Sequence, residues 1–501
     1  MSSGLDPLYG RQWHLKNTGQ ESALPGIDIN VETVWQQGNE GQGITVAVID
    51  DGLELVHEDL ADRVLAGQSL NLASNGRAAN DPSPVDASDD HGTAVAGLIA
   101  AARNSTGGRG VAPRSSLLAA NLLTAPSSDS MEASALLHAE NVVAISNNSW
   151  GSSDDDNELS YNGPLARAAI DQGANSGRSG RGIVYLFAAG NGAVRQQPDY
   201  SMLQTGQRSV YDAYNNHPFV LNIGAVRADG TPSEYSEPGA NILVSAPSNS
   251  YSLTLPGLYT TALSGSYQGY AYLGQAWAYA NYRPDFGGTS GATPIAAGVV
   301  ALMLAANPQL SWRDVRWILA STAKAVSNSP ESDTAALGHG SYSHKTGFGL
   351  VDAQAAVSMA QSHTLLPTMK TCTLDIVAGS AQLAPDSNGE LQANVNTGSC
   401  DITQLETAEL VLTSTSNVGN TAITLTSPLS RSSVLATPHN CFSRNVLGYH
   451  IATACNVTYS GWRFQSVRHM GENPTGTWSL LISGMHGSDR LSNTQLILRG
   501  V

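Results

Sequence analysis

Three short glycine-rich turns carry side chains that together could perform nucleophilic catalysis. Ser290 lies in the run GGTSGATP, His91 in DDHGTA, and Asp50 ends the apolar run VAVID. A hydroxyl becomes a nucleophile when an imidazole takes its proton and a carboxylate orients that imidazole. A polar turn serine and a structural histidine are the ordinary alternatives for Ser290 and His91 taken singly. The three turns together, in the order Asp, His, Ser, predict acyl-transfer chemistry.

The first 360 residues contain the elements that must position these side chains. Apolar strand-like runs cover residues 44–49, 117–122, 142–146, 183–188 and 220–226. Helical patterns cover residues 91–102, 131–140, 290–306 and 311–324, the last with Ser311 as N-cap. Alternation of strands and helices indicates a parallel sheet with helices on both faces. We therefore expect an α/β domain over residues 1–360, with Ser290 at a helix N-terminus.

The remainder of the chain has a different pattern. After residue 370, short strands rich in Thr and Leu are separated by turn residues, for example at 408–414, 421–426, 478–482 and 495–498. Many short strands with turn signals between them are typical of a β-sandwich or barrel. We expect residues 361–501 to form this second, all-β domain.

Composition narrows the class of partner. Only 13% of the 501 residues are charged and the formal net charge is −16. Nucleic-acid binding needs a basic face, so this chain is not expected to bind nucleic acid. An acidic balance suits basic substrates or divalent cations. The longest apolar run, 295–306, is shorter than a bilayer requires, so no membrane span is expected.

The four cysteines, at 372, 400, 441 and 455, all fall in the second domain. An even number confined to one region predicts two disulfides formed in an oxidising compartment. Of three possible pairings we prefer the sequential one, Cys372–Cys400 and Cys441–Cys455; four buried thiols are the alternative. No signal peptide is visible at residues 1–4. We expect a secreted chain whose leader has been removed, the alternative being a cytosolic protein.

The motifs resemble those of two known families. The turns around Asp50, His91 and Ser290 resemble the signatures of the subtilisin-like serine proteases, in which the same order occurs. The runs ITLTSP and GENPTGTW resemble the P-domain that follows the protease domain in kexin and furin. Near the C-terminus the usual Gly-Trp is replaced by SNT at 492–494. The resemblance implies a subtilisin-like domain followed by a P-domain.

The resemblance implies a role for each residue of the catalytic set. Ser290 would be the nucleophile, and His91 the general base and then the acid for the leaving amine. Asp50 rather than Asp51 would orient the imidazole, because it aligns with the first Asp after the strand. Asn191, in AAGNG, matches the subtilisin Asn that donates to the oxyanion together with the Ser290 backbone N–H. An ordinary Asn-Gly turn is the alternative for Asn191.

The same resemblance implies a substrate groove. The segment Ser149–Trp150–Gly151 resembles the edge that pairs with the substrate as an added strand. The acidic run Asp154, Asp155 and Asp156 follows at the place of the acidic S1 floor in kexin and furin, where we favour Asp154. Asp212, in YDAYN, resembles their second S1 acid. A solvated acidic loop is the alternative for residues 154–156.

Three further carboxylates, Asp51, Asp89 and Asp90, resemble the acidic lining of the S2 pocket. Carboxylates in a desolvated pocket favour guanidinium and ammonium groups over apolar side chains. The resemblance therefore predicts cleavage after pairs such as Lys-Arg or Arg-Arg. A broad-specificity subtilisin is the main alternative, followed by a binding protein built on a protease scaffold.

Calcium is also implied by the resemblance, with one to three structural ions. The first site would take the side chains of Asp6, Asp59 and Asn104 and the carbonyls of Ala102, Thr106 and Gly108. The second site, behind S1, would take Asp154, Asp199 and Glu237. These are the oxygen ligands that Ca²⁺ prefers, although exposed acids are usually only solvated.

One segment has no counterpart of this length in furin. Residues 251–282 are rich in Tyr, Gly and Ala and carry few charges. We expect a tyrosine-lined surface loop near the active site that could dock a partner. Protein or peptide substrates, a removed propeptide and a separate folding chaperone or inhibitor are the partners expected for a monomeric enzyme of this kind.

Overall fold

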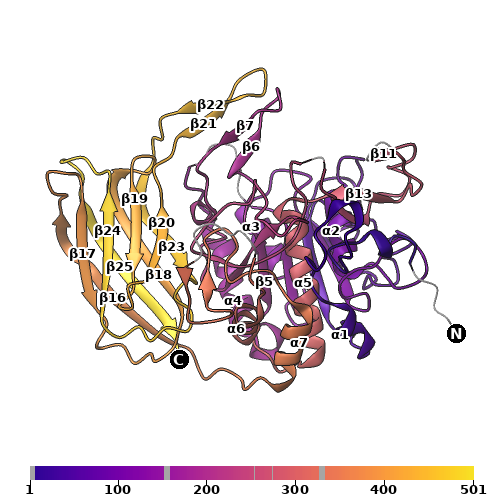
Figure 1. Ribbon diagram of the computed structural model, residues 1–501, viewed down its shortest axis with the longest axis horizontal. Helices are drawn as coiled ribbons and strands as arrows, with labels where there is room; N and C mark the ends of the chain where they lie inside the picture. Colours follow the sequence, from indigo (N-terminus) through magenta and orange to yellow (C-terminus); the bar gives the residue numbers. More distant parts are fainter. Residues whose placement is uncertain (1–5, 152–157, 253, 273–274, 327–332) are drawn as a thin grey trace.

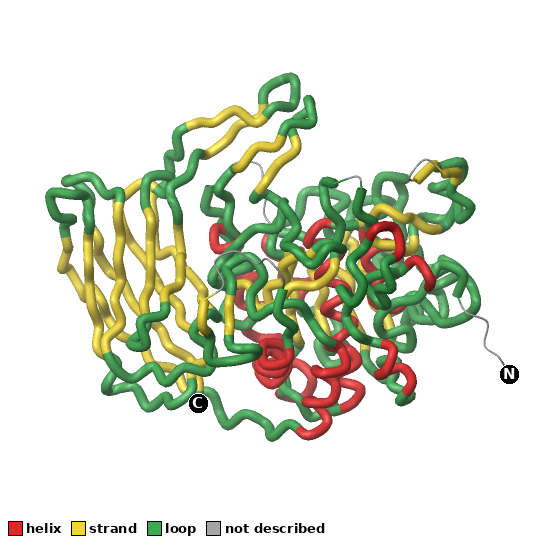
Figure 2. Tube along the Cα trace, in the orientation of Figure 1, coloured by secondary structure: helices red, strands yellow, loops and turns green. Residues whose placement is uncertain are grey.

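The computed structural model describes residues 6–151, 158–252, 254–272, 275–326 and 333–501. Strands and helices alternate in the N-terminal part, and strands alone make up the C-terminal part (Figures 1 and 2). An α/β subtilisin-like domain followed by an all-β domain was the expected fold class, and it is confirmed. The domain boundary near residue 360 stays a prediction; the last helix ends at Ser362 and the next strand begins at Lys370.

The N-terminal part is built on a seven-stranded sheet in the order β2-β3-β1-β4-β5-β8-β9. All its strand pairs are parallel. The strands are β1 Thr45–Asp50, β2 Leu70–Asn71, β3 Ser116–Asn121, β4 Ile145–Asn148, β5 Val184–Ala188, β8 Val220–Val226 and β9 Ile242–Pro247. Every residue of β1, β4, β5, β8 and β9 is buried. This is the pattern of a parallel sheet covered on both faces.

Helices pack around this sheet. They are α1 Glu32–Gln36, α2 His91–Ala100, α3 Asp129–Leu136, α4 Pro164–Gly180, α5 Gly288–Ala306, α6 Trp312–Thr322 and α7 Ala353–Ser362. The expected N-cap of α6 is present, because the Ser311 side chain accepts from the Asp314 amide and Asp314 bonds back to Ser311. The run at 142–146 was expected to be a strand, but the chain turns at 137–142 and β4 starts only at Ile145.

The N-terminal part also contains short antiparallel strand pairs outside the main sheet. They join β6 Val194–Gln196 with β7 Met202–Gln204, β10 Leu258–Thr261 with β13 Tyr282–Phe286, β11 Ala271–Tyr272 with β12 Gln275–Ala276, and β14 Asp333–Thr334 with β15 Ser341–Tyr342. Of these, β13 leads directly into α5 and therefore into the turn that carries Ser290.

The C-terminal part contains two four-stranded antiparallel sheets, β16-β25-β18-β23 and β17-β24-β19-β20. The strands are β16 Lys370–Leu383, β17 Leu391–Asn396, β18 Leu405–Asn417, β19 Ala422–Thr426, β20 Ser432–Ala436, β23 Thr458–Ser466, β24 Thr477–Ser483 and β25 Leu491–Gly500. Side chains alternate between buried and exposed along β24, as expected for a sandwich.

Both disulfides have the preferred pairing, Cys372–Cys400 and Cys441–Cys455. The second closes the base of a hairpin formed by β21 Cys441–Arg444 and β22 His450–Thr453. This hairpin rises beside the β6–β7 hairpin of the N-terminal part (Figure 1). A hydrogen bond of 3.1 Å from the His450 amide to the Gln197 side chain joins the two hairpins.

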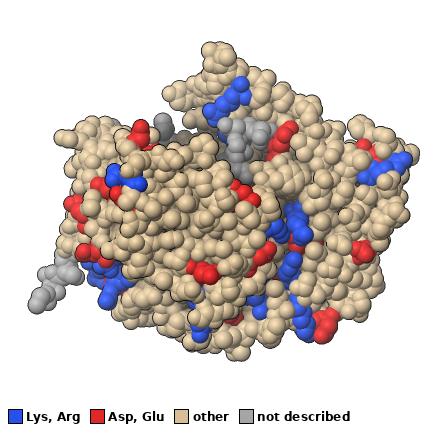
Figure 3. All heavy atoms as spheres, turned by 180° about the vertical axis from the view of Figure 1, so that it is seen from behind, with Lys and Arg blue, Asp and Glu red and all other residues tan. Residues whose placement is uncertain are grey.

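The seam between the two parts is extensive. Val210, Tyr211 and Ala240 of the N-terminal part belong to the hydrophobic core of the sandwich. Across the seam, Arg316 of α6 makes a buried ion pair of 2.9 Å with Glu406 of β18. On the face drawn in Figure 3, Lys and Arg gather right of the centre in the lower half, with some Asp and Glu among them, and most of the surface is neither blue nor red.

Among the described residues, one helix has the length and composition of a membrane span. This is α5, and 83% of its most apolar stretch is buried inside the protein, as in a core helix.

Candidate active site

Asp50 and His91 lie in contact at the carboxyl edge of the sheet. Asp50 is the last residue of β1 and His91 the first of α2, and their Oδ1 and Nδ1 atoms are 2.8 Å apart. Burial by itself would lower the pKa of His91, but the charges of Asp50, Asp51 and Asp90 outweigh it and raise that pKa. An imidazole held in this way can accept a proton from a hydroxyl at its other nitrogen.

Two features bring α2 this close to β1. Gly92 faces the end of β1, where a Cβ would lie 2.1 Å from the Gly52 carbonyl oxygen, so only glycine fits. The Asp51 carboxylate accepts from the backbone amides of His91 and Gly92, at 3.1 and 2.7 Å, and so caps the helix. Burial and the charge of Asp50 raise the pKa of Asp51 to about 7.

Ser290 lies in the first turn of α5, after Gly288 with a φ of +72°. Its hydroxyl donates to the Ser149 carbonyl at 3.1 Å, and the Ser149 hydroxyl donates to the Ser290 carbonyl at 3.0 Å. That carbonyl can accept from Ser149 because Pro294, four residues on, has no N–H to offer it. Ser290 is thus held to the segment that follows β4.

Asn191 lies beside the same turn, three residues after β5. Its Oδ1 accepts from the Thr289 amide at 2.8 Å and from the Thr289 hydroxyl at 3.0 Å. These bonds hold the Asn191 Oδ1 atom towards Thr289, so the Asn191 Nδ2 atom points away from Thr289. An amide nitrogen beside a nucleophile can donate to a developing oxyanion.

A pocket of about 240 Å³ opens between Ser290, Asn191 and the segment Ser149–Gly151. Its back wall is formed by Trp150, whose ring packs against Phe187 and Tyr214 at 5.3 and 5.1 Å. Acidic residues dominate its charged lining: Glu158, Asp212 and Glu237, with Arg208 as the basic residue. Asp212 was expected here, whereas Asp154, Asp155 and Asp156 lie outside the described residues.

The lining also contains residues that sequence reasoning missed or placed differently. Glu158 and Arg208 were not proposed, and Glu237 was proposed as a calcium ligand. Glu237 is buried, and its Oε1 accepts from the Gly192 amide at 2.9 Å. An arginine four residues before Asp212, in a chain with only 25 basic residues, was the available signal for Arg208.

The three expected S2 acids differ in their surroundings. Asp51 caps α2, as described above. The Asp90 Oδ2 atom accepts from the guanidinium of Arg283 at 2.9 Å, so its charge is already compensated. Asp89 is half-buried, and from the described residues its side chain accepts one long bond, 3.4 Å, from the Asp86 amide. Of the three, Asp89 is therefore the one whose charge is least engaged by the protein.

The residues expected at the first calcium site come together. Asp59 Oδ1 accepts from the Asn104 side chain at 3.0 Å, and Asp6 accepts from the amides of Asn104 and Ser105. Asp6 also pairs with Arg109 at 2.6 Å. Asp59 Oδ2 is buried without a hydrogen-bond partner among the described residues. Burial and the charge of Asp6 raise the pKa of Asp59 to about 8.

The residues expected at the second calcium site lie in different environments. Asp199 is exposed in the turn of the β6–β7 hairpin, where it bonds to Ser201 at 2.6 Å. Glu237 is buried below the pocket. Near Gly192, Gln207 Oε1 and Glu237 Oε1 lie 2.7 and 2.8 Å from the place where a Cβ on that glycine would be.

The tyrosine-rich segment differs from the expected surface loop. Tyr259 and Tyr282 are buried, and with Leu8 and Trp277 they form a small core of their own. Only Tyr270, at 37%, is a large exposed aromatic among the described residues of 251–282. Tyr259 and Tyr282 turn inward because they lie on the paired strands β10 and β13, which pack on α2; there Thr260 and Thr261 donate to carbonyls of that helix.

Comparison with known proteins assigns the chain. Residues 41–349 match the model of the subtilase family, and residues 406–498 match the proprotein convertase P-domain. A PC3-like endoprotease of Hydra vulgaris is 32% identical over 97% of this chain and 64% of the relative. Human neuroendocrine convertase 2 is 32% identical over 95% of this chain and 70% of the relative.

Among solved structures, the serine protease of Aeromonas sobria in complex with a chaperone superposes with a TM-score of 0.83. It is 27% identical and the match covers 99% of this chain and 95% of that one. The same protease solved alone gives a TM-score of 0.82. The chain spans under two thirds of the length of the first curated relatives it matches, 64% and 58%. It belongs to the subtilase family and carries a proprotein convertase P-domain.

Proposed function

We propose that this chain is a secreted, calcium-dependent serine endopeptidase that cleaves after pairs of basic residues. Two observations carry the proposal: the Asp50–His91 contact of 2.8 Å, and a pocket whose lining includes Ser290 and Asn191. Ser290 is the nucleophile, His91 the general base, Asp50 the residue that orients His91, and Asn191 the oxyanion donor.

The reaction follows from these positions. In the proposed reaction the Ser290 hydroxyl leaves the Ser149 carbonyl and donates to the His91 nitrogen that does not face Asp50, as catalytic bonds often tighten only with substrate. Ser290 Oγ then attacks the peptide carbonyl carbon while His91 takes its proton. The oxyanion accepts from the Asn191 amide and the Ser290 N–H. The tetrahedral species collapses as His91 protonates the leaving amine, and water releases the acyl group by the same steps.

The acidic pocket supports the preference for basic residues. Asp212, Glu158 and Glu237 line it, and a guanidinium or ammonium in their midst forms charge-assisted hydrogen bonds. The Asp212 Oδ1 atom accepts from the backbone amides of Tyr214 and Asn215, and these two bonds hold the carboxylate in place. A second candidate, broad specificity, is favoured by Arg208, which places a positive charge in the same lining.

Peptides ending in Lys-Arg and in Ala-Ala-Pro-Phe before the scissile bond separate the two. We expect the Lys-Arg peptide to have a kcat/KM at least about 100-fold higher, and Asp212→Asn to lower that ratio by about tenfold. Equal turnover of both peptides would overturn the basic-pair preference. Ser290→Ala is the inactive control, and absence of turnover by folded wild-type chain would favour a binding protein instead.

The first calcium site rests on a chemical fit. Asp6, Asp59 and Asn104 lie together, and among the described residues Asp59 Oδ2 has no hydrogen-bond partner. The carbonyls of Ala102, Thr106 and Gly108 would complete the oxygen ligands. A divalent cation there would compensate the two carboxylates and tie the N-terminal segment to the loop after α2. A second ion, with Asp154, Asp199 and Glu237, needs the hairpin turn that bears Asp199 to approach Glu237.

Thermal unfolding tests the first calcium site. A chelator should lower the Tm of the wild-type chain by several degrees, and added Ca²⁺ should restore it, because a ligand that binds only the native state stabilises it. Asp59→Asn should have a lower Tm in Ca²⁺ and lose its response to chelation. An unchanged chelator response in Asp59→Asn would place the calcium elsewhere.

Secretion and a folding partner complete the proposal. Two disulfides support an oxidising compartment for this chain. The chaperone in the Aeromonas sobria complex supports a propeptide or a separate chaperone that assists folding. We propose that the mature enzyme is a monomer, which sedimentation would test directly.

A further inference from the structure

The turn before Ser290 is held at each of its peptide groups. The Gly288 amide donates to the Asn249 side-chain Oδ1 at 3.0 Å. The Gly288 carbonyl accepts from the Ser248 hydroxyl at 2.7 Å, and the Thr289 amide of the same peptide donates to Asn191 Oδ1 at 2.8 Å. The Gly288–Thr289 peptide therefore lies between Ser248 on one side and Asn191 on the other.

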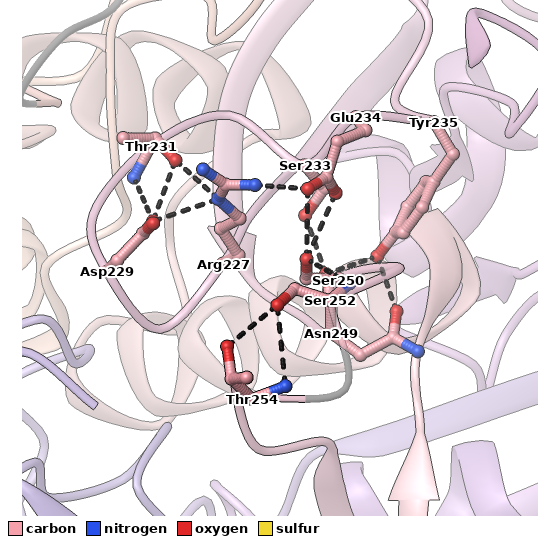
Figure 4. Close-up of polar contacts among 10 residues, drawn as sticks. All are labelled: Arg227, Asp229, Thr231, Ser233, Glu234, Tyr235, Asn249, Ser250, Ser252 and Thr254. Atoms are coloured by element: carbon pink, nitrogen blue, oxygen red, sulfur yellow. Dashed lines mark hydrogen bonds and ion pairs between the residues drawn. The ribbon is translucent and has the colours of Figure 1, made fainter. Parts of the chain in front are cut away.

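Asn249 has this position because its own side chain is fixed. The Tyr235 phenol oxygen lies 2.7 Å from Asn249 Oδ1 and 2.9 Å from the Asn249 carbonyl (Figure 4). The Ser233 hydroxyl also donates to that carbonyl at 2.9 Å. Tyr235 is buried, and burial raises its pKa, so the phenol stays a donor at any pH at which the enzyme works.

The Asn249 side chain also fills the space next to Gly287. A Cβ on Gly287 would lie 1.9 Å from Asn249 Cγ. Beyond Asn249, the chain is braced by Ser250, whose hydroxyl donates to Glu234 at 3.0 Å, and Glu234 pairs with Arg227 (Figure 4). Asn249 is thus a rigid contact and not a mobile surface residue.

We propose that Asn249 is a positioning residue for hydrolysis, acting through Gly288 on the amide of Asn191. The inference rests on the proposed function, in which Asn191 donates to the oxyanion. Asn249 fixes the Gly288 amide, the following peptide fixes Asn191 Oδ1, and the Asn191 nitrogen is aimed as a result. Without Asn249, the Asn191 side chain still has its amide nitrogen, but that nitrogen can shift relative to the oxyanion.

Kinetics of Asn249→Ala test the proposal. We expect kcat to fall by about 10-fold, and by no more than the roughly 100-fold that a misplacement of about 1 Å costs, with KM within about twofold. Asn249→Asp keeps an acceptor for Gly288 and Tyr235 and should stay within about threefold of wild type. Tyr235→Phe, which keeps the ring, should lower kcat in the same direction as Asn249→Ala. A changed KM with an unchanged kcat would overturn the proposal, because Asn249 would then affect substrate binding and not the chemical step.

A double-mutant cycle with Asn191→Ala distinguishes positioning from general damage. If Asn249 acts through Asn191, Asn249→Ala lowers kcat by no more than about twofold in the Asn191→Ala background. A further full 10-fold loss in that background would overturn the proposal. Affinity for a peptide boronate should fall in parallel with kcat, while affinity for the product peptide should not, because only the boronate engages the oxyanion donors.

Two controls keep the outcome interpretable. Ser252→Ala lies in the same polar network but contacts Thr254 and not the Ser290 turn, and it should leave kcat unchanged. If Asn249→Ala does not fold, Tyr235→Phe and Asn249→Asp carry the test. Absence of turnover by wild-type chain would instead contradict the proposed function, so the two failures are distinguishable.

Discussion

His91 is the residue whose titration should govern the rate. The three carboxylates Asp50, Asp51 and Asp90 raise its pKa above the ordinary value, and Asp50 contributes the most of the three. The base must be neutral to take the Ser290 proton, so activity is lost as the pH falls through the pKa of His91. Asp90 affects His91 even though Arg283 compensates much of its charge.

The pH profile of kcat/KM is therefore expected to rise through a midpoint above 6.5. Asp90→Asn removes one of the charges that favour the imidazolium and should move the midpoint to lower pH without abolishing turnover. Arg283→Gln exposes the full charge of Asp90 and should move it to higher pH. If wild type and both variants have the same midpoint, Asp90 does not act on His91.

The contact between Asp50 and His91 could be predicted because each motif is local. Asp50 ends β1, His91 begins α2, and Ser290 lies in the first turn of α5, and Ser311 was placed correctly as a cap for the same reason. Asp90 was expected to face substrate, but its partner Arg283 lies 193 positions away and no local pattern joins them. The residue roles themselves remain predictions until they are tested.

At the scale of elements, α2 depends on the β10–β13 pair. Thr260 and Thr261 donate to the Ala94 and Thr93 carbonyls at 2.7 and 2.6 Å, and Phe286 packs on the His91 ring at 5.3 Å. Tyr259 of β10 and Tyr282 of β13 are buried, and three tyrosines between the strands, Tyr267, Tyr272 and Tyr279, are partly buried against them. Composition alone indicated an aromatic surface, because it carries no information on which way the side chains turn.

Gly97→Ala tests how tightly α2 packs on β10. A Cβ there would lie 2.2 Å from Thr261 Oγ1 and 2.9 Å from the Thr261 amide nitrogen. Overpacking costs about 1–3 kcal/mol, against a gain of about 1 kcal/mol in helix propensity. We expect a lower Tm and a lower kcat, as His91 moves with its helix. Gly10→Ala, where nothing lies within 4 Å, is the matched control and should change neither.

The second calcium site, expected from the resemblance to furin, stays a prediction. Asp199 lies in the exposed turn between β6 and β7, Glu237 is buried beside the pocket, and Asp154 lies outside the described residues. Alternation of strands and helices was enough to predict a parallel sheet covered by helices, but it contains no information on the order of the seven strands or on the turn in which Asp199 lies.

At the scale of the molecule, buried ion pairs join the two parts. Arg316 and Glu406 are each about 1% exposed, and Arg313 also pairs with Glu406. Burial would raise the pKa of Glu406, but Arg313 and Arg316 outweigh it and hold the carboxyl ionised. The charges of Arg313 and Arg316 on one side and of Glu406 on the other are therefore compensated across the seam.

Glu406→Gln should therefore destabilise both parts together. Removing one partner of a buried pair costs about 3–5 kcal/mol, because it leaves the arginines uncompensated. We expect a single unfolding transition at lower urea, seen equally by probes in the sheet and in the sandwich. Lys370→Gln breaks the exposed pair with Asp401 and should be near neutral. Two separate transitions in Glu406→Gln would show that the seam does not couple the parts.

The loop at 208–216 has one consequence for how the enzyme is made. Its Val210 and Tyr211 are buried in the sandwich core, while Asp212 and Asn215 line the pocket beside Ser290. A ribosome delivers Asp50, His91 and Ser290 more than a hundred residues before strand β25 closes that core. We therefore expect the 208–216 loop to reach its final position only after β25 has been synthesised and the sandwich core has closed around Val210 and Tyr211.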